Sequence, residues 1–264
     1  MLISHRKNFI FTKTVKTAGT SVESYFEKWC LPEGEWQELH FREEHISDAG
    51  IVGKRAARPS DATWYNHMSA YNIRKQLGQE LWDKYFKFTV VRNPFDKLLS
   101  GYFMFNRAQR GNRYLRRINR YTSKVIGREN PINSLLHRGE IRRFRTWLQR
   151  FGKLALENKP LIEDVDIAHY MKPIELSLLD RDKYLIDGEE CVDFFIQYEN
   201  LHQDIKHVCE KLSIPFEAQR IPKFKRGIRH NNIPVMEYFD KQSQELVHEL
   251  YAWEISRFCY DIPA

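Results

Sequence analysis

The sequence predicts an α/β protein in which helices flank a central parallel sheet. Two segments support this fold class, because each one is read as a strand, a tight turn and a helix in that order. They are "FIFTKTVKTAGTS" (Phe9–Ser21) and "YFKFTVVRNPFDKLLSGYF" (Tyr85–Phe103). In a sheet of this kind, ligand-binding groups lie at the carboxyl ends of the parallel strands. We therefore expect a binding site where these two strands end.

The first segment predicts a strand over Asn8–Thr12 and a helix over about Ser21–Trp29. Thr20 and Glu23 have the T-x-x-E spacing of a capping box, so we expect Glu23 to fold back on the helix start. The polar stretch over residues 32–59 is expected to be an irregular surface excursion.

The second segment follows a predicted helix over Ser69–Leu77, which Gly78 ends. Phe86–Val91 is rich in β-branched and aromatic residues, which is typical of a buried strand. Asn93 can cap the next helix, and Pro94 occupies its first position, where a missing N–H costs nothing.

The C-terminal part predicts a hairpin that turns at Asp187–Gly188, followed by a strand that runs into Tyr198. Amphipathic helices are expected over Leu201–Leu212 and over about Asp240–Phe258. We expect a single domain over residues 1–264, with a basic, mostly helical insert at about 107–150.

The amino-acid composition excludes several classes of protein for this chain. The chain has 264 residues, of which 42% are hydrophobic and 14% aromatic, enough to bury a full core and too many for disorder. Its 42 Lys and Arg against 35 Asp and Glu give a net charge of +7, which favours polyanionic partners. The four cysteines form no CxxC pair, so we expect reduced thiols rather than disulfides or a zinc site. No targeting or membrane-spanning segment is read, and we expect a cytoplasmic protein.

The turn Lys16-Thr17-Ala18-Gly19-Thr20-Ser21 predicts a phosphate or sulfate site. It joins a strand to a helix, so backbone N–H groups and the helix dipole converge there, and three hydroxyls add donors. It is not a Walker A loop, because its lysine precedes the glycine. The alternative is a capped helix beside exposed lysines, and for Lys13 we expect a solvated position at the strand end.

Arg92 ends the second strand, and Ser100 lies about two turns into the following helix. A guanidinium and a hydroxyl suit a phosphate monoester. An arginine at a strand end is a weak signal alone. Two anion sites on neighbouring strand ends, however, match a nucleotide that carries phosphate at both its 5′ and 3′ positions.

"VKTAGTS" resembles the 5′-phosphosulfate loop of the carbohydrate-type sulfotransferases (the family 2 group, of uronyl and chondroitin type), and "VVRNPFDKLLSGYF" resembles their 3′-phosphate motif. The similarity extends to "VDFFIQYENLHQDIKHVCEKL" and to "EYFDKQSQELVHELYAWEISRFCYDI", and so covers most of the chain apart from the basic insert. The family often has Ile-Pro before its Lys-Thr. This chain has Thr14-Val15 there, which leaves the start of the loop freer.

The resemblance implies a nucleotide-kinase-like sheet, the donor 3′-phosphoadenosine 5′-phosphosulfate (PAPS) and the product 3′,5′-diphosphoadenosine. Lys16 would contact the oxygen that bridges sulfate and phosphate, Thr17–Ser21 the 5′-phosphate, and Arg92 with Ser100 the 3′-phosphate. No carboxylate cluster of metal-ligand type accompanies the loop, so we expect no metal.

A hydroxyl acceptor needs a general base, and His67 is our candidate. It precedes a helix at the place where the uronyl 2-O-sulfotransferases carry a catalytic histidine. The alternative is a histidine that caps the helix or packs near Trp64. His169, also at a family-like position, is the second candidate. Glu23 would be the acidic candidate, but its capping-box spacing explains it without chemistry.

Two basic segments each allow more than one interpretation. In "PKFKRGIRHNN", the residues Lys225, Arg226 and Arg229 either close over the nucleotide or acceptor, or belong to a solvated loop. The arginine-rich insert, with Arg113 and Arg117, is a solvated helical face, a groove for an acidic polysaccharide or a nucleic-acid surface.

We expect a sulfotransferase that moves a sulfuryl group from PAPS by in-line transfer to a carbohydrate or other hydroxyl acceptor, an acidic one included. The alternatives are a nucleotide-dependent kinase that uses the same anion site, which the missing Walker A order disfavours, and a nucleic-acid-binding protein.

Overall fold

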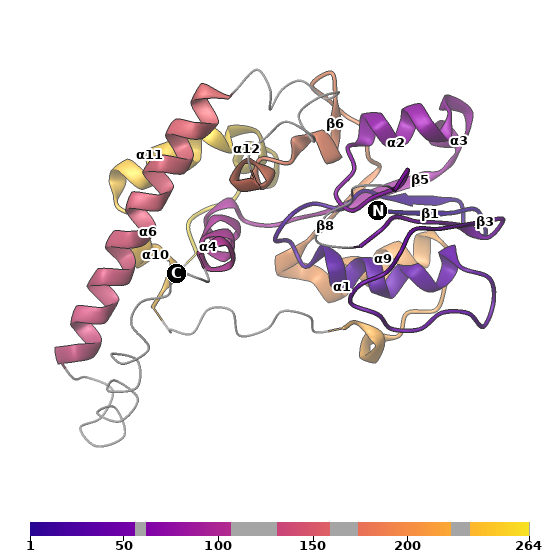
Figure 1. The fold of residues 1–264 in the computed structure, drawn as a ribbon, viewed down its shortest axis with the longest axis horizontal. Coiled ribbons are helices and arrows are strands. Elements are labelled where there is room, and N and C mark those ends of the chain that lie inside the picture. Colours follow the sequence, from indigo (N-terminus) through magenta and orange to yellow (C-terminus); the bar gives the residue numbers. More distant parts are fainter. Residues whose placement is uncertain (56–61, 107–130, 159–173, 223–232, 264) are drawn as a thin grey trace. The chain divides into compact units, whose positions relative to one another are not determined.

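A mixed six-stranded sheet forms the centre of one of the two compact units of the chain (Figure 1). The computed structural model describes residues 1–55, 62–106, 131–158, 174–222 and 233–263. The chain groups into two compact units, Met1–Arg92 with Asn158–Arg226 and Asn93–Glu157 with Gly227–Ala264. The sheet belongs to the first unit. Whether the chain acts as the single domain expected from the sequence stays a prediction.

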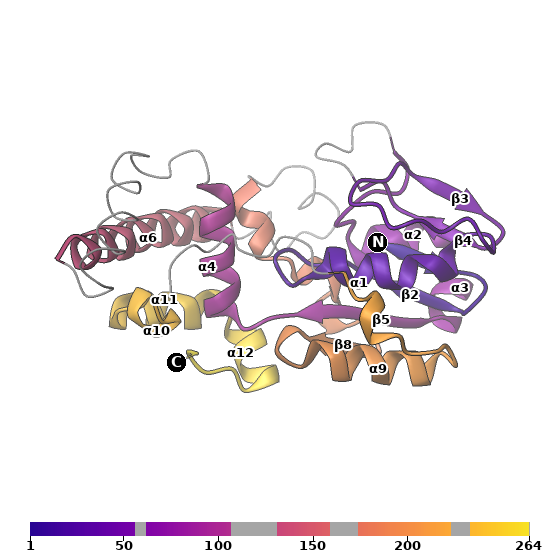
Figure 2. The ribbon, with the colours of Figure 1, turned by 90° about the horizontal axis from the view of Figure 1, so that it is seen from below.

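The strands lie in the order β3-β4-β1-β2-β5-β8. Their bounds are Leu2–Ser4 (β1), Phe9–Phe11 (β2), His45–Ser47 (β3), Gly50–Val52 (β4), Phe86–Val91 (β5) and Phe194–Gln197 (β8). Strands β2, β5 and β8 are mutually parallel, whereas β1, β3 and β4 pair antiparallel. The predicted α/β fold is confirmed, and Figure 2 shows β3 and β8 at opposite edges of the sheet.

The register of β2 and β5 brings their carboxyl ends to one edge of the sheet. Phe11 lies opposite Phe88, and the backbone N–H of Thr12 continues the ladder by donating to the carbonyl of Phe88 at 3.1 Å. The segments that follow the two strands therefore start as neighbours.

Helices cover both faces of the sheet in this unit (Figure 1). Alternation along β2 explains the two cores, since Phe9 and Phe11 face one side and Ile10 the other. Helices α1 (Gly19–Phe26) and α9 (Leu201–Lys211) pack on the phenylalanine side. Helices α2 (Ala70–Leu77) and α3 (Gln79–Lys84) pack on the other.

Short elements complete the first unit. The 3-10 turns are η1 (Glu27–Cys30), η2 (Ile174–Leu178), η3 (Arg181–Lys183), η4 (Tyr198–Asn200) and η5 (Ala218–Arg220). The expected hairpin is present as β6 (Leu185–Ile186) and β7 (Glu189–Glu190), with Asp187 and Gly188 at positive φ in the turn.

Two sequence-based expectations were wrong in detail. The stretch over residues 32–59 was expected to be irregular, but it contains β3 and β4, a hairpin that extends the sheet through β1. Its short edge strand has no clear apolar alternation, so the pattern gave no signal. The expected helix over about 240–258 is divided at Tyr251 into α11 (Lys241–Leu250) and α12 (Ala252–Phe258).

The second unit is helical. It contains α4 (Pro94–Phe105), α6 (Pro131–Glu157), α10 (Val235–Tyr238), α11 and α12. Its core is aromatic, with Phe144 of α6 in edge contact with Tyr102, Tyr238 and Phe239. Asn93 caps α4 by accepting from the Phe95 N–H at 3.0 Å, as predicted. Of the insert at about 107–150, residues 107–130 lie outside the described residues.

No helix in the described ranges is both long and apolar enough to cross a membrane.

Candidate active site

The loop between β2 and α1 has a backbone suited to an anion. Lys16 and Ala18 are left-handed, with φ of 64° and 63°, a conformation that residues other than glycine seldom adopt. Ala18 is the N-cap of α1, and that helix start has neither a side-chain cap nor an acidic residue in its first turn. A helix start of this kind presents N–H groups and the positive end of the dipole to a ligand.

Gly19 lies at the closest approach of this loop. A Cβ at this position would lie 3.0 Å from Cγ of Lys13 and 3.2 Å from the carbonyl oxygen of Thr14. A Cβ here would need the loop to shift by a few tenths of an ångström, so packing favours glycine at this position.

The hydroxyl of Thr17 is used inside the loop, which differs from the sequence-based expectation. The Thr14 hydroxyl donates its hydrogen to the Val90 carbonyl, so Thr17 Oγ1, 2.7 Å from Thr14 Oγ1, must be the donor of that pair. The side chain of Thr17 is fully buried. Its backbone N–H is then the group that Thr17 offers to a ligand, and its hydroxyl donates to Thr14, whose own hydroxyl bonds β5 at Val90.

Arg92, at the end of β5, contacts the loop directly. Its Nη1 donates to the carbonyl of Lys16 at 2.9 Å, and its guanidinium carbon lies 4.0 Å from the ring centre of Tyr198, at the end of β8. Three neighbouring parallel strands thus each contribute a residue at the same edge. Ser100 lies in α4 of the second unit, so its pairing with Arg92 stays a prediction.

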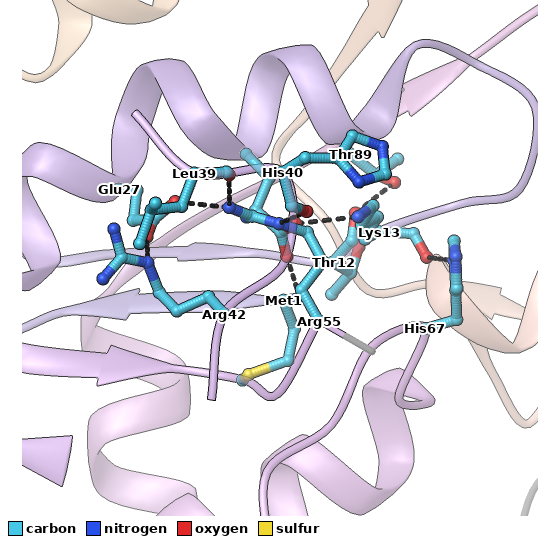
Figure 3. A network of polar contacts seen from close by, with 11 residues as sticks. Met1, Thr12, Lys13, Glu27, Leu39, His40, Arg42, Arg55, His67 and Thr89 are labelled. Carbon is cyan, nitrogen blue, oxygen red and sulfur yellow. Dashed lines mark hydrogen bonds and ion pairs between the residues drawn. The ribbon is translucent and has the colours of Figure 1, made fainter. Parts of the chain in front are cut away.

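A buried ion-pair network includes Lys13, which precedes the loop, and Arg55 (Figure 3). Nζ of Lys13, whose side chain is 2% exposed, lies 2.7 Å from Oε2 of Glu23, and Nη1 of Arg55 lies 2.8 Å from the same oxygen. Arg55 also pairs with Glu27 at 3.0 Å. Lys13 is therefore not the solvated lysine that we expected.

Glu23 does not form the expected capping box, and it is not suited to be a base. Burial by itself raises the pKa of Glu23, but the charges of Lys13, the Met1 amino group and Arg55 outweigh this and hold the pKa well below its ordinary value. A carboxylate that is bound to three cations has little tendency to take a proton. No local pattern marks this network, because Arg55 lies 32 positions further along the chain than Glu23.

His67 has the state that a general base needs. Its Nδ1 lies 2.9 Å from the carbonyl oxygen of Lys13, which only accepts, so Nδ1 carries the hydrogen and Nε2 keeps its lone pair. Burial, followed by the charges of Lys13 and Lys183, lowers the pKa of His67 well below its ordinary value. The imidazole is therefore neutral at pH 7.

His67 also has a strained backbone, with φ of 60°, as functional residues often do. The alternative interpretation, that it caps the next helix, is wrong: Ser69 is the N-cap of α2 and accepts from the Asn72 N–H at 3.2 Å. Figure 3 shows Lys13 between the ion-pair network and His67, so one residue joins the two.

Three residues that contact the loop or the network beside it were not expected from the sequence. Two of them are Arg55 and Tyr198. The third is Asp180, whose Oδ2 accepts from the Val15 N–H at the start of the loop at 2.6 Å. A strand-end tyrosine at 198 was readable from the sequence, but nothing local marks Asp180 or Arg55.

Several predicted site residues lie outside the described residues, and their roles stay predictions. They are His169, Lys225, Arg226, Arg229, Arg113 and Arg117. In the described half of the insert, α6 carries Arg138, Arg142 and Arg145 along a hollow of about 500 Å³. Arg145 is structural, since it pairs with Asp240 at 3.1 Å and donates to the Tyr238 carbonyl at 2.9 Å.

Within the described ranges, no three His, Cys, Asp or Glu side chains gather closely enough to hold a metal ion. Metal independence stays a prediction.

A protein-family model described as "Sulfotransferase family" matches residues 1–261. Comparisons with curated proteins and with solved structures gave no match.

Proposed function

The chain belongs to the sulfotransferase family, and from this premise we propose that it moves a sulfuryl group from PAPS to a hydroxyl of a carbohydrate acceptor. Sulfuryl transfer follows from the family. The donor, the acceptor class and the residue roles are our proposal, argued below from the geometry of the first unit.

The residues at the strand ends fit a doubly charged adenosine nucleotide. The uncapped start of α1, with Thr17–Ser21, would hold the 5′-phosphate through backbone N–H groups other than that of Ser21, which donates to the Ala18 carbonyl at 2.8 Å. Arg92 would hold the 3′-phosphate, and a contribution from Ser100 stays a prediction. The observation that carries the proposal is the 2.9 Å hydrogen bond from Arg92 Nη1 to the Lys16 carbonyl. It makes the two predicted anion sites adjacent, as one small nucleotide requires.

PAPS carries the sulfuryl group on its 5′-phosphate, and 3′,5′-diphosphoadenosine is the leaving group. Lys16 stabilises the negative charge that grows on the bridging oxygen, and the positive end of α1 does the same for the 5′-phosphate. His67 accepts the hydroxyl proton of the acceptor at Nε2 while its Nδ1–H stays bonded to the Lys13 carbonyl. Most of the catalysis is then positioning and charge stabilisation.

Lys16→Ala tests the donor assignment. We expect turnover with labelled PAPS to fall by roughly a hundredfold or more, with an unchanged thermal midpoint, because a donor to the developing charge is lost. Lys84→Ala, which removes an exposed lysine of α3, is the matched control and should leave turnover unchanged. Near-normal turnover in Lys16→Ala would refute the role of Lys16.

The carbohydrate acceptor is supported by the resemblance of the two motifs to carbohydrate sulfotransferases and by the net charge of +7. A screen with labelled PAPS should include acidic polysaccharides, neutral glycans and simple glycolipids. Incorporation into a glycan supports the proposal, whereas incorporation only into small non-carbohydrate alcohols contradicts the acceptor class. Phosphoryl transfer from ATP in the same screen would favour the kinase alternative.

A further inference from the structure

The loop at Lys16 does not adopt its conformation by local preference. Two residues with side chains, Lys16 and Ala18, take positive φ within three positions, and each is disfavoured by contacts of its own Cβ. Such a backbone persists only where neighbouring groups fix it. The Thr14 hydroxyl bonds Val90 of β5, the Thr17 hydroxyl bonds Thr14, and Arg92, which follows β5, bonds the Lys16 carbonyl.

The start of the loop has a separate anchor from a distant part of the chain. Oδ2 of Asp180 accepts the Val15 N–H at 2.6 Å, across 165 positions of sequence. A bond to a carboxylate is stronger than one between neutral groups, and the carboxylate is 1% exposed, so water competes little for it. Proline at position 15 would have no N–H to donate, so this anchor depends on the valine.

Asp180 is itself held firmly. The Lys183 N–H donates to its carbonyl at 3.1 Å at the start of η3, and the side chains of Lys183 and Asp182 form a buried ion pair in the same turn. Lys183 also acts on His67 through its charge. One short turn thus lies beside both the loop and the candidate base.

A carboxylate near an anion site weakens anion binding, so Asp180 does not help to bind the phosphate through its charge. It can help only by holding the loop in shape. We propose that Asp180 is a positioning residue of the donor loop: by accepting the Val15 N–H, it holds the left-handed turn at Lys16 in the form that binds the 5′-phosphate. This inference rests on the proposed function for the identity of the ligand.

The first test measures the loop without any ligand. Hydrogen–deuterium exchange of the peptide over residues 12–18 should rise at least several-fold in Asp180→Ala, whereas the β5 peptide should not change. Asp180→Asn keeps an acceptor oxygen and should stay close to the wild-type protein. Glu189→Ala, which removes an exposed carboxylate of β7, is the control. Unchanged exchange of the loop in Asp180→Ala overturns the inference.

The second test separates positioning from general stability. Asp180→Ala should weaken binding of 3′,5′-diphosphoadenosine by roughly tenfold and leave adenosine 3′-monophosphate within about twofold, since only the former places a phosphate in the loop. Equal weakening of both nucleotides would show a merely structural role. Adding Val15→Pro to Asp180→Ala removes the unpaired N–H and should recover part of the loss.

The two proposals fail in different ways. If the wild-type protein binds no 3′,5′-diphosphoadenosine, the proposed function fails, while loop exchange in Asp180→Ala still decides the role of Asp180. If the wild-type protein binds it and Asp180→Ala binds it equally well, only the inference about Asp180 fails.

Discussion

His67 illustrates how a single residue acquires a role from its surroundings. Its Nδ1–H is bound to the Lys13 carbonyl, its pKa is lowered by burial and two lysines, and its Nε2 is left as an acceptor. We expect His67→Gln to lower turnover by about 10²- to 10⁴-fold, the range for a lost general base. Binding of 3′,5′-diphosphoadenosine should be retained. A variant that turns over normally excludes His67 and returns attention to His169.

The same pKa predicts how stability depends on pH. In the unfolded chain His67 takes a proton near pH 6.5, whereas the folded protein resists protonation to a much lower pH. Stability should therefore fall as pH drops below about 6.5, by up to about 1.4 kcal/mol per pH unit from this residue. Urea unfolding at pH 7 and pH 5 measures it. The loss between these pH values should be smaller in His67→Gln, and an equal loss in both proteins contradicts the lowered pKa.

Among single residues, Lys16, Arg92 and His67 could be proposed from the sequence because each lies beside a predicted strand end or helix start, and their roles stay predictions. The expectations for Lys13 and Glu23 were wrong. Whether a lysine after a strand is solvated depends on what packs over it, and here Arg55 and Glu23 arrive from elsewhere in the chain.

The ion pairs of Glu23 connect three secondary-structure elements, because Glu23 lies in α1, Lys13 follows β2 and Arg55 follows β4. Glu23→Gln would leave the Met1 amino group, Lys13 and Arg55 buried without the carboxylate that they share, and we expect a loss of about 3–5 kcal/mol in the free energy of unfolding. Glu33→Gln is the control, because Glu33 is 92% exposed and lies 3.9 Å from Arg6. Its effect should stay within about 0.5 kcal/mol. Similar losses in both variants would contradict a structural network.

Packing between the loop and α1 makes a second prediction for the elements. The Cβ of Gly19→Ala would meet the Thr14 carbonyl at 3.2 Å and the pinned Lys13 side chain at 3.0 Å, so the loop must shift. We expect binding of 3′,5′-diphosphoadenosine to weaken by about tenfold, with a stability loss of only about 1–2 kcal/mol. Titration calorimetry and urea unfolding measure the two effects, and unchanged affinity would show that the loop tolerates the shift.

The strands that carry the site were predicted at their observed places because apolar runs and turn residues mark them. The antiparallel half of the sheet was not, since the edge strand β3 carries a polar, half-exposed pattern. Its existence follows from pairing with β4, which no local signal shows. The division of the last helix at Tyr251 was missed for a similar reason, because the apolar spacing continues across it.

For the molecule as a whole, the sequence predicted the α/β fold and the sulfotransferase family because two strand–turn–helix segments occur in the right order. The proposed chemistry uses a lysine, an arginine and a helix start as its cationic groups. We therefore expect turnover to persist in EDTA at concentrations that remove divalent cations. A loss of turnover that Mg²⁺ restores would contradict this, and would revive the kinase-like alternative.

The central claim is that the ends of β2 and β5 bind the two phosphates of one adenosine nucleotide. Calorimetric titration of the wild-type protein with 3′,5′-diphosphoadenosine, adenosine 5′-monophosphate and adenosine 3′-monophosphate tests it most directly. We expect the diphosphate to bind at least about tenfold more tightly than either monophosphate, because each of its phosphates binds at a different strand end. Equal affinities for the diphosphate and one monophosphate would contradict it, since one of the two strand ends would then contribute nothing.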